Sequence, residues 1–196
     1  MNKKIRVFLV LLFISLCSVG MALASESEKG SLNVEATNES NSTNEANEVA
    51  MDKDNSNQLN KEIYQNVQVD LKNDFQIQLP NYTANAESFS SRVLDAPHSG
   101  QIVDIVMWTE DKVYKYAQEK LVKPQGEVYK NIVNNFFTEG TLKELEISNH
   151  PAIYHEYESG KKSLYIITED YGFAIFSEML SQEEMFKIAE SIDFVE

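Results

Sequence analysis

The abrupt change of composition near residue 61 constrains the fold more than any other feature of this 196-residue sequence. Residues 25–60 contain no aromatic residue and are dominated by Asn, Ser and Glu, with eight acidic residues against two lysines. Such a segment buries too little apolar surface to offset the conformational entropy that folding would remove. We therefore predict a disordered acidic linker over 25–60 and one folded domain over 61–196, where Tyr, Phe, Ile and Val recur regularly.

The N-terminus has the features of a secretory signal. Three basic residues within the first six positions precede an apolar run over 7–24 that ends in the small-residue pattern Ala-Leu-Ala. This arrangement predicts a signal peptide over 1–24, with cleavage before Ser25. The protein is then exported and is either extracellular or associated with the cell envelope. An uncleaved run is long enough to anchor the chain in a membrane, and this alternative stays open.

Cysteine content and charge exclude several classes of function. Cys17 is the only cysteine and lies within the signal, so the mature chain has no disulfide, thiolate metal site or cysteine nucleophile. Lipid attachment at Cys17 is disfavoured because Leu16 precedes it, where such motifs need a small residue. The net charge is −14, and it becomes −17 without the three basic residues of the signal. This field repels nucleic acids and anionic lipids. We expect no nucleic-acid partner, and membrane contact only through an uncleaved signal anchor.

Most of the folded region is predicted to form β-strands. Alternating apolar residues predict a half-buried strand over 73–80, and the run 101–109 is apolar on both alternations, which predicts a strand buried on both sides. Further strands are expected at the following places: 92–94, 142–147, 152–158, 163–169 and 173–179. Sequons at Asn38, Asn41 and Asn81 leave glycosylation open.

Three helices are expected. Apolar residues at helical spacing predict one over 113–121, ended by Pro124, and a second over 128–137, closed by Gly140 at a C-cap position. Ser181 and Glu184 form a capping box in sequence and predict a closing helix. Its apolar face is formed by Met185, Ile188, Ala189 and Ile192.

The stretch 149–160 contains two of the three histidines, His150 and His155, beside Glu156. In a strand, successive side chains point to opposite faces, so His155 and Glu156 cannot converge on one ion. A metal ion would need His98 or distant acids, and we predict no metal site, no catalytic set and no cofactor. A ligand or partner surface is the remaining possibility, for which the candidates are Trp108, Tyr154, His155 and Tyr157.

Two functions from different classes fit these features. The first is an exported, non-catalytic binding or assembly-support domain, whose partner is an extracytoplasmic protein or a small apolar ligand. The alternative is an extracytoplasmic hydrolase or metal-dependent enzyme that uses His155 and nearby acids. Acids and histidines gathered on one sheet face would favour the enzyme, whereas scattered acids around an apolar groove would favour the binding domain.

Three stretches occur in an order that resembles the PsbP-like superfamily, relatives of the extrinsic P protein of photosystem II. They are FQIQLP (75–80), ISNHPAIYHEY (147–157) and FKIAESIDF (186–194), so the resemblance covers about residues 70–195. It implies an α+β domain in which an antiparallel sheet is sandwiched by helices (α/β/α). The usual Gly before Pro-Ala is His150 here, and the resemblance supplies no catalytic residues. The closing pattern is also similar to the half-barrel of lipoprotein carriers.

Overall fold

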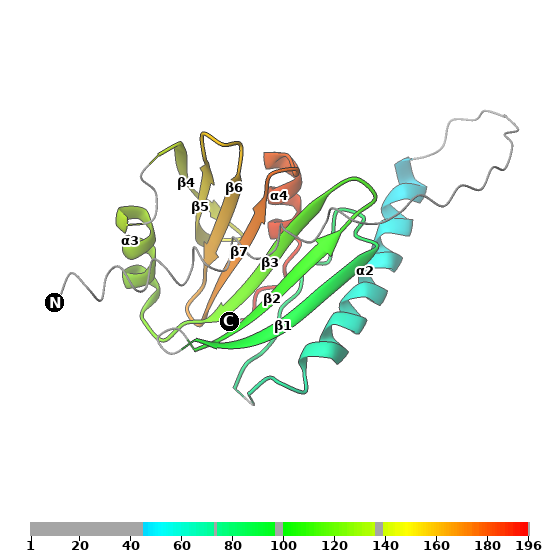
Figure 1. Ribbon diagram of the computed structural model, residues 1–196, viewed down its shortest axis with the longest axis horizontal. Helices are drawn as coiled ribbons and strands as arrows, with labels where there is room; N and C mark the ends of the chain where they lie inside the picture. Colours follow the sequence, from blue (N-terminus) through cyan, green and yellow to red (C-terminus); the bar gives the residue numbers. More distant parts are fainter. Residues whose placement is uncertain (1–44, 73, 97–99, 136–138, 196) are drawn as a thin grey trace, which may run out of the picture. The chain divides into compact units, whose positions relative to one another are not determined.

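The computed structural model describes residues 45–72, 74–96, 100–135 and 139–195 (Figure 1). The side chains of 45–54 and of Asn135 are not described. The chain divides into two units, Met1–Val49 and Ala50–Glu196, and of the first only the helical residues from Glu45 are described. The predicted signal peptide, Cys17, His98 and the sequons at Asn38 and Asn41 all lie outside the described residues.

The second unit is built on one antiparallel sheet of seven strands, in the order β1-β2-β3-β7-β6-β5-β4. An α+β domain with an antiparallel sheet, as predicted, is confirmed. The strands are β1 (Ser88–Ala96), β2 (Gly100–Trp108), β3 (Val113–Lys120), β4 (Thr141–Ile147), β5 (His150–Glu156), β6 (Lys162–Ile167) and β7 (Tyr171–Ser177). The helices are α2 (Glu45–Val67), α3 (Gln125–Asn135) and α4 (Gln182–Glu190).

The hydrophobic core lies on one side of this sheet, which we call the first face. The helices α2 and α4 pack there, through Leu59 and Ile63 of α2 and Met185 and Ile188 of α4. The sheet contributes side chains that are at most 2% exposed: Val103, Ile105, Met107, Tyr114, Tyr116, Ala152, Tyr154, Leu164, Ile166, Phe173 and Ile175. The opposite side is the second face, where α3 lies beside β6 and Gln125 Nε2 donates to the Ile167 carbonyl at 2.7 Å.

The closing helix is confirmed with its capping box. Ser181 accepts a hydrogen bond from the Glu184 amide at 3.1 Å, and the Glu184 carboxylate accepts one from the Ser181 amide at 2.8 Å. These two bonds satisfy donors that a helix start leaves unpaired. The Lys112 ammonium also lies 2.5 Å from the Glu184 carboxylate, which ties α4 to the turn between β2 and β3.

The first described helix, α2, begins inside the stretch that composition assigns to the linker. The predicted domain boundary at residue 61 falls within this helix. Ser56 is fully buried and its hydroxyl lies 3.0 Å from that of Thr83, while Leu59 is 7% exposed in the core. Polar composition hides this packing, because only a few apolar residues of the helix face the sheet.

The prediction of a helix over 113–121 is wrong, since these residues form the central strand β3. The stretch fits both periods, because Val113, Tyr116 and Ala117 have helical spacing while Tyr114, Tyr116 and Gln118 alternate. Pairing with β2 on one side and β7 on the other decides the outcome. Both tyrosines are then buried on the first face.

The predicted strand over 73–80 is also corrected. Residues 74–80 form an extended strap across the first face, and within the described part only Pro80 makes a strand-like bridge, to Ile192. The amide of Gln78 donates to Gln118 Oε1 at 2.8 Å, and the Tyr116 hydroxyl donates to the Gln78 carbonyl. Side chains of β3 thus replace a neighbouring strand as hydrogen-bond partners, which is why the alternating pattern did not lead to a sheet strand.

The remaining predicted elements are confirmed with shifted ends. The strand expected over 92–94 extends to Ser88–Ala96, and the one expected over 101–109 is β2, buried on both faces. The second expected helix is α3; Phe136 and Phe137 lie outside the described residues. Gly140 stands before β4 with φ of +92°, where a Cβ would lie 2.2 Å from the Glu156 carbonyl oxygen. Within the described part of the chain, no helix has the length and apolarity to cross a membrane.

Candidate functional site

A strip of half-buried side chains runs across β2, β3 and β7 on the second face. It consists of Val106, Trp108, Val113, Lys115, Ala117 and Phe176 and is called the β2–β3–β7 strip below. The strand register makes it continuous, because Trp108 pairs with Val113, while Lys115 lies between Val106 and Phe176. Residues paired across an antiparallel ladder share a face and touch one another. The strip therefore joins two aromatic rings, aliphatic groups and one ammonium on neighbouring strands.

The alternation of the strands explains why these residues face away from the core. Tyr114 and Tyr116 point to the first face, so Val113, Lys115 and Ala117 point to the second. In β7 the same rule puts Phe173 in the core and Phe176 in the strip. One strand thus serves packing on one face and leaves an amphipathic surface on the other.

A buried carboxylate lies beside the strip. Asp104 of β2 has 2% of its side chain exposed and is held between two cations on neighbouring strands. The Arg92 guanidinium lies 2.6 Å from its Oδ2, and the Lys115 ammonium lies 2.8 Å from its Oδ1. The Lys115 nitrogen is also 6.0 Å from the centroid of the Phe176 ring. Two cations around one carboxylate leave an excess of one positive charge at the strip.

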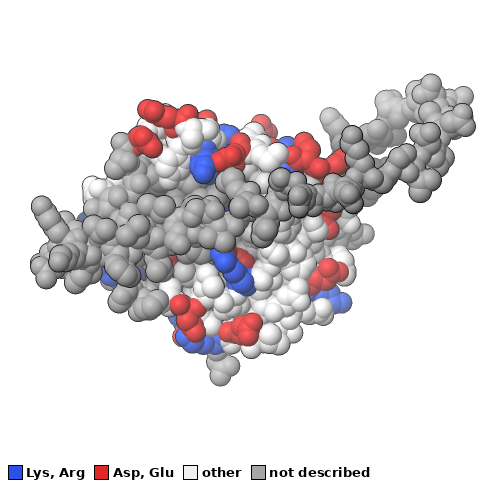
Figure 2. All heavy atoms as spheres, in the orientation of Figure 1, with Lys and Arg blue, Asp and Glu red and all other residues white. Residues whose placement is uncertain are grey.

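This local positive charge contrasts with the acidic chain as a whole. On the described part of the face drawn in Figure 2, acidic and basic side chains are interspersed and no broad basic area is seen. One sequence feature points to this cluster. Asp104 interrupts the otherwise apolar run 102–108, and a buried charge in such a place needs a partner.

His155 is fully buried, and its surroundings make it a structural group. Its Nε2 lies 2.7 Å from the Glu139 carbonyl oxygen, and its ring centroid is 4.1 Å from that of Tyr157. Burial lowers the pKa of His155, an effect that the Glu139 carbonyl partly opposes. The neutral ring is therefore favoured, with Nε2 engaged by the backbone. Such a nitrogen is poorly placed to bind an ion or move a substrate proton.

The predicted separation of His155 and Glu156 is confirmed. His155 faces the second face, whereas Glu156 lies with Tyr154, whose hydroxyl is 3.3 Å from the Glu156 carboxylate. Burial, together with the Glu156 charge, raises the pKa of Tyr154 to about 12. Among the described residues, no group of three His, Cys, Asp or Glu side chains is arranged to hold a metal ion.

The four residues proposed as a ligand or partner surface do not share one surface. Trp108 lies in the strip, and His155 and Tyr157 lie together beyond β6. Tyr154 is 1% exposed on the first face, where its ring packs against Phe186 of α4 at 5.7 Å. Of this group, Trp108 and Tyr157 are half-buried, whereas Tyr154 and His155 are buried.

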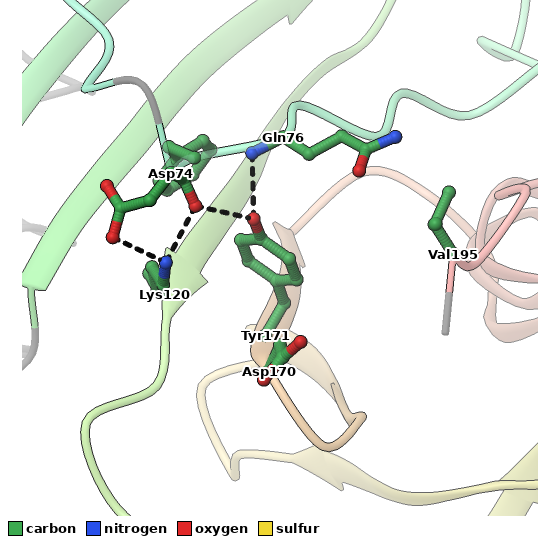
Figure 3. A pocket seen from close by; sticks show the side chains of 7 residues that line it. Asp74, Gln76, Lys120, Asp170, Tyr171 and Val195 are labelled. Atoms are coloured by element: carbon green, nitrogen blue, oxygen red, sulfur yellow. Dashed lines mark hydrogen bonds and ion pairs between the residues drawn. The ribbon is translucent and has the colours of Figure 1, made fainter.

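A polar cavity of about 310 Å³ lies at the end of the sheet, where β3 ends and β7 begins (Figure 3). The Lys120 ammonium bonds the Asp74 carboxylate at 2.7 Å, and the Tyr171 hydroxyl accepts the Gln76 amide at 2.7 Å. The hydrogen bond and charge of Lys120 lower the pKa of Asp74, and Asp74 in turn raises the pKa of Lys120. These groups bond one another, so the residues that line the cavity fix the strap to the sheet.

Part of the chain matches a known family. Residues 104–192 match the family described as Domain of unknown function (DUF4367). The matched segment begins within β2 and ends just after α4, so it covers less than half of the 196-residue chain and contains the whole strip. No curated protein and no solved structure matches the chain.

Proposed function

We propose that this protein is an exported, non-catalytic binding or assembly-support domain that acts outside the cytoplasmic membrane. The observation that carries the proposal is the β2–β3–β7 strip, with half-buried Trp108 and Phe176 beside Lys115. Aromatic rings are enriched at the centre of protein interfaces. The partner is an extracytoplasmic protein or a small apolar ligand.

The N-terminal sequence supports the proposed location. A basic start, the apolar run 7–24 and a small-residue ending are the three parts of a secretory signal. The acidic stretch that follows would act as a solvated tether that holds the domain away from the membrane, because its eight acidic residues against two lysines favour contact with water over packing.

We include the resemblance to the PsbP-like superfamily in the same proposal. An antiparallel sheet with α2 and α4 against one face, and α3 beside β6 on the other, supports an α/β/α sandwich of this kind. A fold carries no activity of its own, so the likeness adds a scaffold and not a reaction.

The test compares the proteins held by matched variants of the mature chain in cell-envelope extracts. Phe176→Ala and Trp108→Ala remove the rings of the strip, and Tyr64→Ala removes a ring that is 50% exposed on α2. We expect the strip variants to lose a partner that wild type and Tyr64→Ala retain, with melting curves confirming that all variants are folded. An identical set of retained proteins for all four chains would contradict the proposal.

Metal content separates this function from the enzyme alternative. Elemental analysis of the purified wild type and His155→Gln should give the same trace values, because His155 Nε2 is engaged by the Glu139 carbonyl. Stoichiometric zinc or manganese that disappears in His155→Gln would favour a hydrolase or metal-dependent enzyme instead.

A further inference from the structure

The two edges of the sheet differ in how they are protected. The edge strand β4 has seven residues, three of which are charged and exposed: Lys143, Glu144 and Glu146. Lys143 donates to Gln182 of α4 at 2.9 Å, and Glu144 accepts from the Tyr129 hydroxyl of α3. Charged side chains and covering helices are the usual means of preventing an edge strand from pairing with another chain. β4 has both.

The other edge, β1, carries fewer charged residues than β4, and α2 covers the first face beside it (Figure 1). It is nine residues long, and its two charged residues, Arg92 and Asp95, are engaged within the domain. Arg92 bonds Asp104 across the sheet, and Asp95 lies 2.6 Å from the Lys72 ammonium. Among the described residues β1 pairs with β2 alone, and its outer backbone groups have no hydrogen-bond partner there. An edge of this length with free donors and acceptors is a template for another strand.

The surroundings of β1 specify the chemistry of a segment that would pair with it. Phe89 and Val93 are only partly buried at the rim of the core, so apolar side chains next to them would extend the first face. Glu87, just before the strand, is exposed, and the chain carries a net charge of −14. Charge complementarity therefore favours a segment with Lys or Arg.

We propose that the β1 edge binds an extended, basic segment of a partner protein as an eighth strand of the sheet. Apolar residues of that segment would lie beside Phe89 and Val93. This interaction goes beyond the function proposed above, because it uses the backbone edge of β1 and not the β2–β3–β7 strip. A second copy of the chain fits less well, because both copies are strongly acidic and full antiparallel overlap would place Arg92 opposite Arg92.

Three nine-residue peptides test the mode of binding to the mature chain by fluorescence anisotropy. One alternates Lys and Val, the second is the same peptide methylated at every backbone nitrogen, and the third alternates Glu and Val. We expect the first to bind at least tenfold more tightly than the methylated peptide, which has equal charge but no backbone donors, and the third to bind most weakly. Equal affinity of the first two would overturn the proposal, because charge alone would then explain binding.

Two proline variants test the location. The amides of neighbouring strand residues point to opposite sides, so only one of Ser90→Pro and Ser91→Pro removes an amide that bonds β2. The variant that keeps the wild-type melting temperature has lost an outward amide, and we expect it to bind the Lys/Val peptide at least tenfold more weakly. Wild-type affinity in that variant would overturn the proposal.

Two further measurements separate the possible outcomes. Trp108→Ala should bind the Lys/Val peptide like wild type. Peptide binding at the β1 edge and partner binding at the strip can therefore be tested independently of each other. Sedimentation should show a monomer at all concentrations tested. A concentration-dependent dimer would overturn the proposal in favour of a second copy at the edge, if the proline variant that keeps the wild-type melting temperature abolishes it.

Discussion

The two faces of the sheet come from the same strands but have different contents. The first face is covered by α2, α4 and the strap, and its tyrosines, isoleucines and Phe173 are almost entirely buried. The second face includes a buried carboxylate with two cations, and next to it the half-buried rings of Trp108 and Phe176. A strand that is apolar on both alternations can therefore have two sides with different surroundings. The first face is buried except at its two edge strands, whereas the second face combines fully buried residues, such as Ile153 and His155, with the half-buried strip.

Two phenylalanines of β7 give the sharpest test of this difference. Phe173→Ala should lower the free energy of unfolding by about 3–5 kcal/mol, because a fully buried ring leaves a cavity in the core. Phe176→Ala should cost about 1–2 kcal/mol, because its ring is half-buried. Denaturant titration of both variants measures the two values. Equal losses would mean that the second face is packed as tightly as the first.

Truncation of α2 tests what covers the first face. A chain that starts at Lys61 lacks Leu59 and Ser56, which are buried, and should melt on the order of 10 °C lower than one that starts at Glu45. A chain that starts at Ser25 serves as the control and should melt like the one from Glu45. Scanning calorimetry gives the midpoints. An unchanged midpoint on starting at Lys61 would show that the first half of α2 adds nothing to the core.

The carboxylate of the second face is expected to matter less than the core. Asp104→Asn should cost about 2–3 kcal/mol, because Lys115, whose side chain is 14% exposed, loses its counter-charge. Arg92→Ala should cost less than about 1 kcal/mol, because Arg92 is half exposed and Lys115 still pairs with Asp104. Urea denaturation of the two variants tests this order. A larger loss for Arg92→Ala would contradict it.

The smallest expected effect is the pH dependence that His155 adds. Because its pKa in the folded protein is lowered from 6.5, the unfolded chain binds more protons as the pH falls below that value. The contribution of neutral His155 to the free energy of unfolding is therefore fully present above about pH 6.5 and declines toward lower pH. The decline is less than ~1.4 kcal/mol per pH unit, the slope that one full proton would give. His155→Gln should remove this slope between pH 6.5 and 5, measured by denaturation at several pH values. The carboxylates with lowered pKa, Asp74 and Glu184, lose their contribution at lower pH.

Prediction from sequence succeeded where one local signal dominated. The run 101–109 could only be a strand buried on both sides, and Ser181 with Glu184 fixed the start of α4. It failed at β3, where the sequence fits both a helical and an alternating period. It also failed at the strap, where alternation correctly indicated an extended backbone but could not show which residues lie beside it. Of the candidate surface residues, Trp108 lies in the strip. Phe176 was not among them, because β7 is apolar on both alternations and its spacing does not show which of its rings face the core.

The sequence by itself determined the alternation of the strands, the acidic charge and the capped closing helix, because each of these follows from neighbouring residues. The tertiary structure alone decided which side of each strand meets α2 and α4, that Asp104 lies between Arg92 and Lys115, and that β1 stands at an edge. These features depend on residues brought together from distant parts of the chain. Local spacing contains no information on that pairing, since register is set by the packing of the whole sheet.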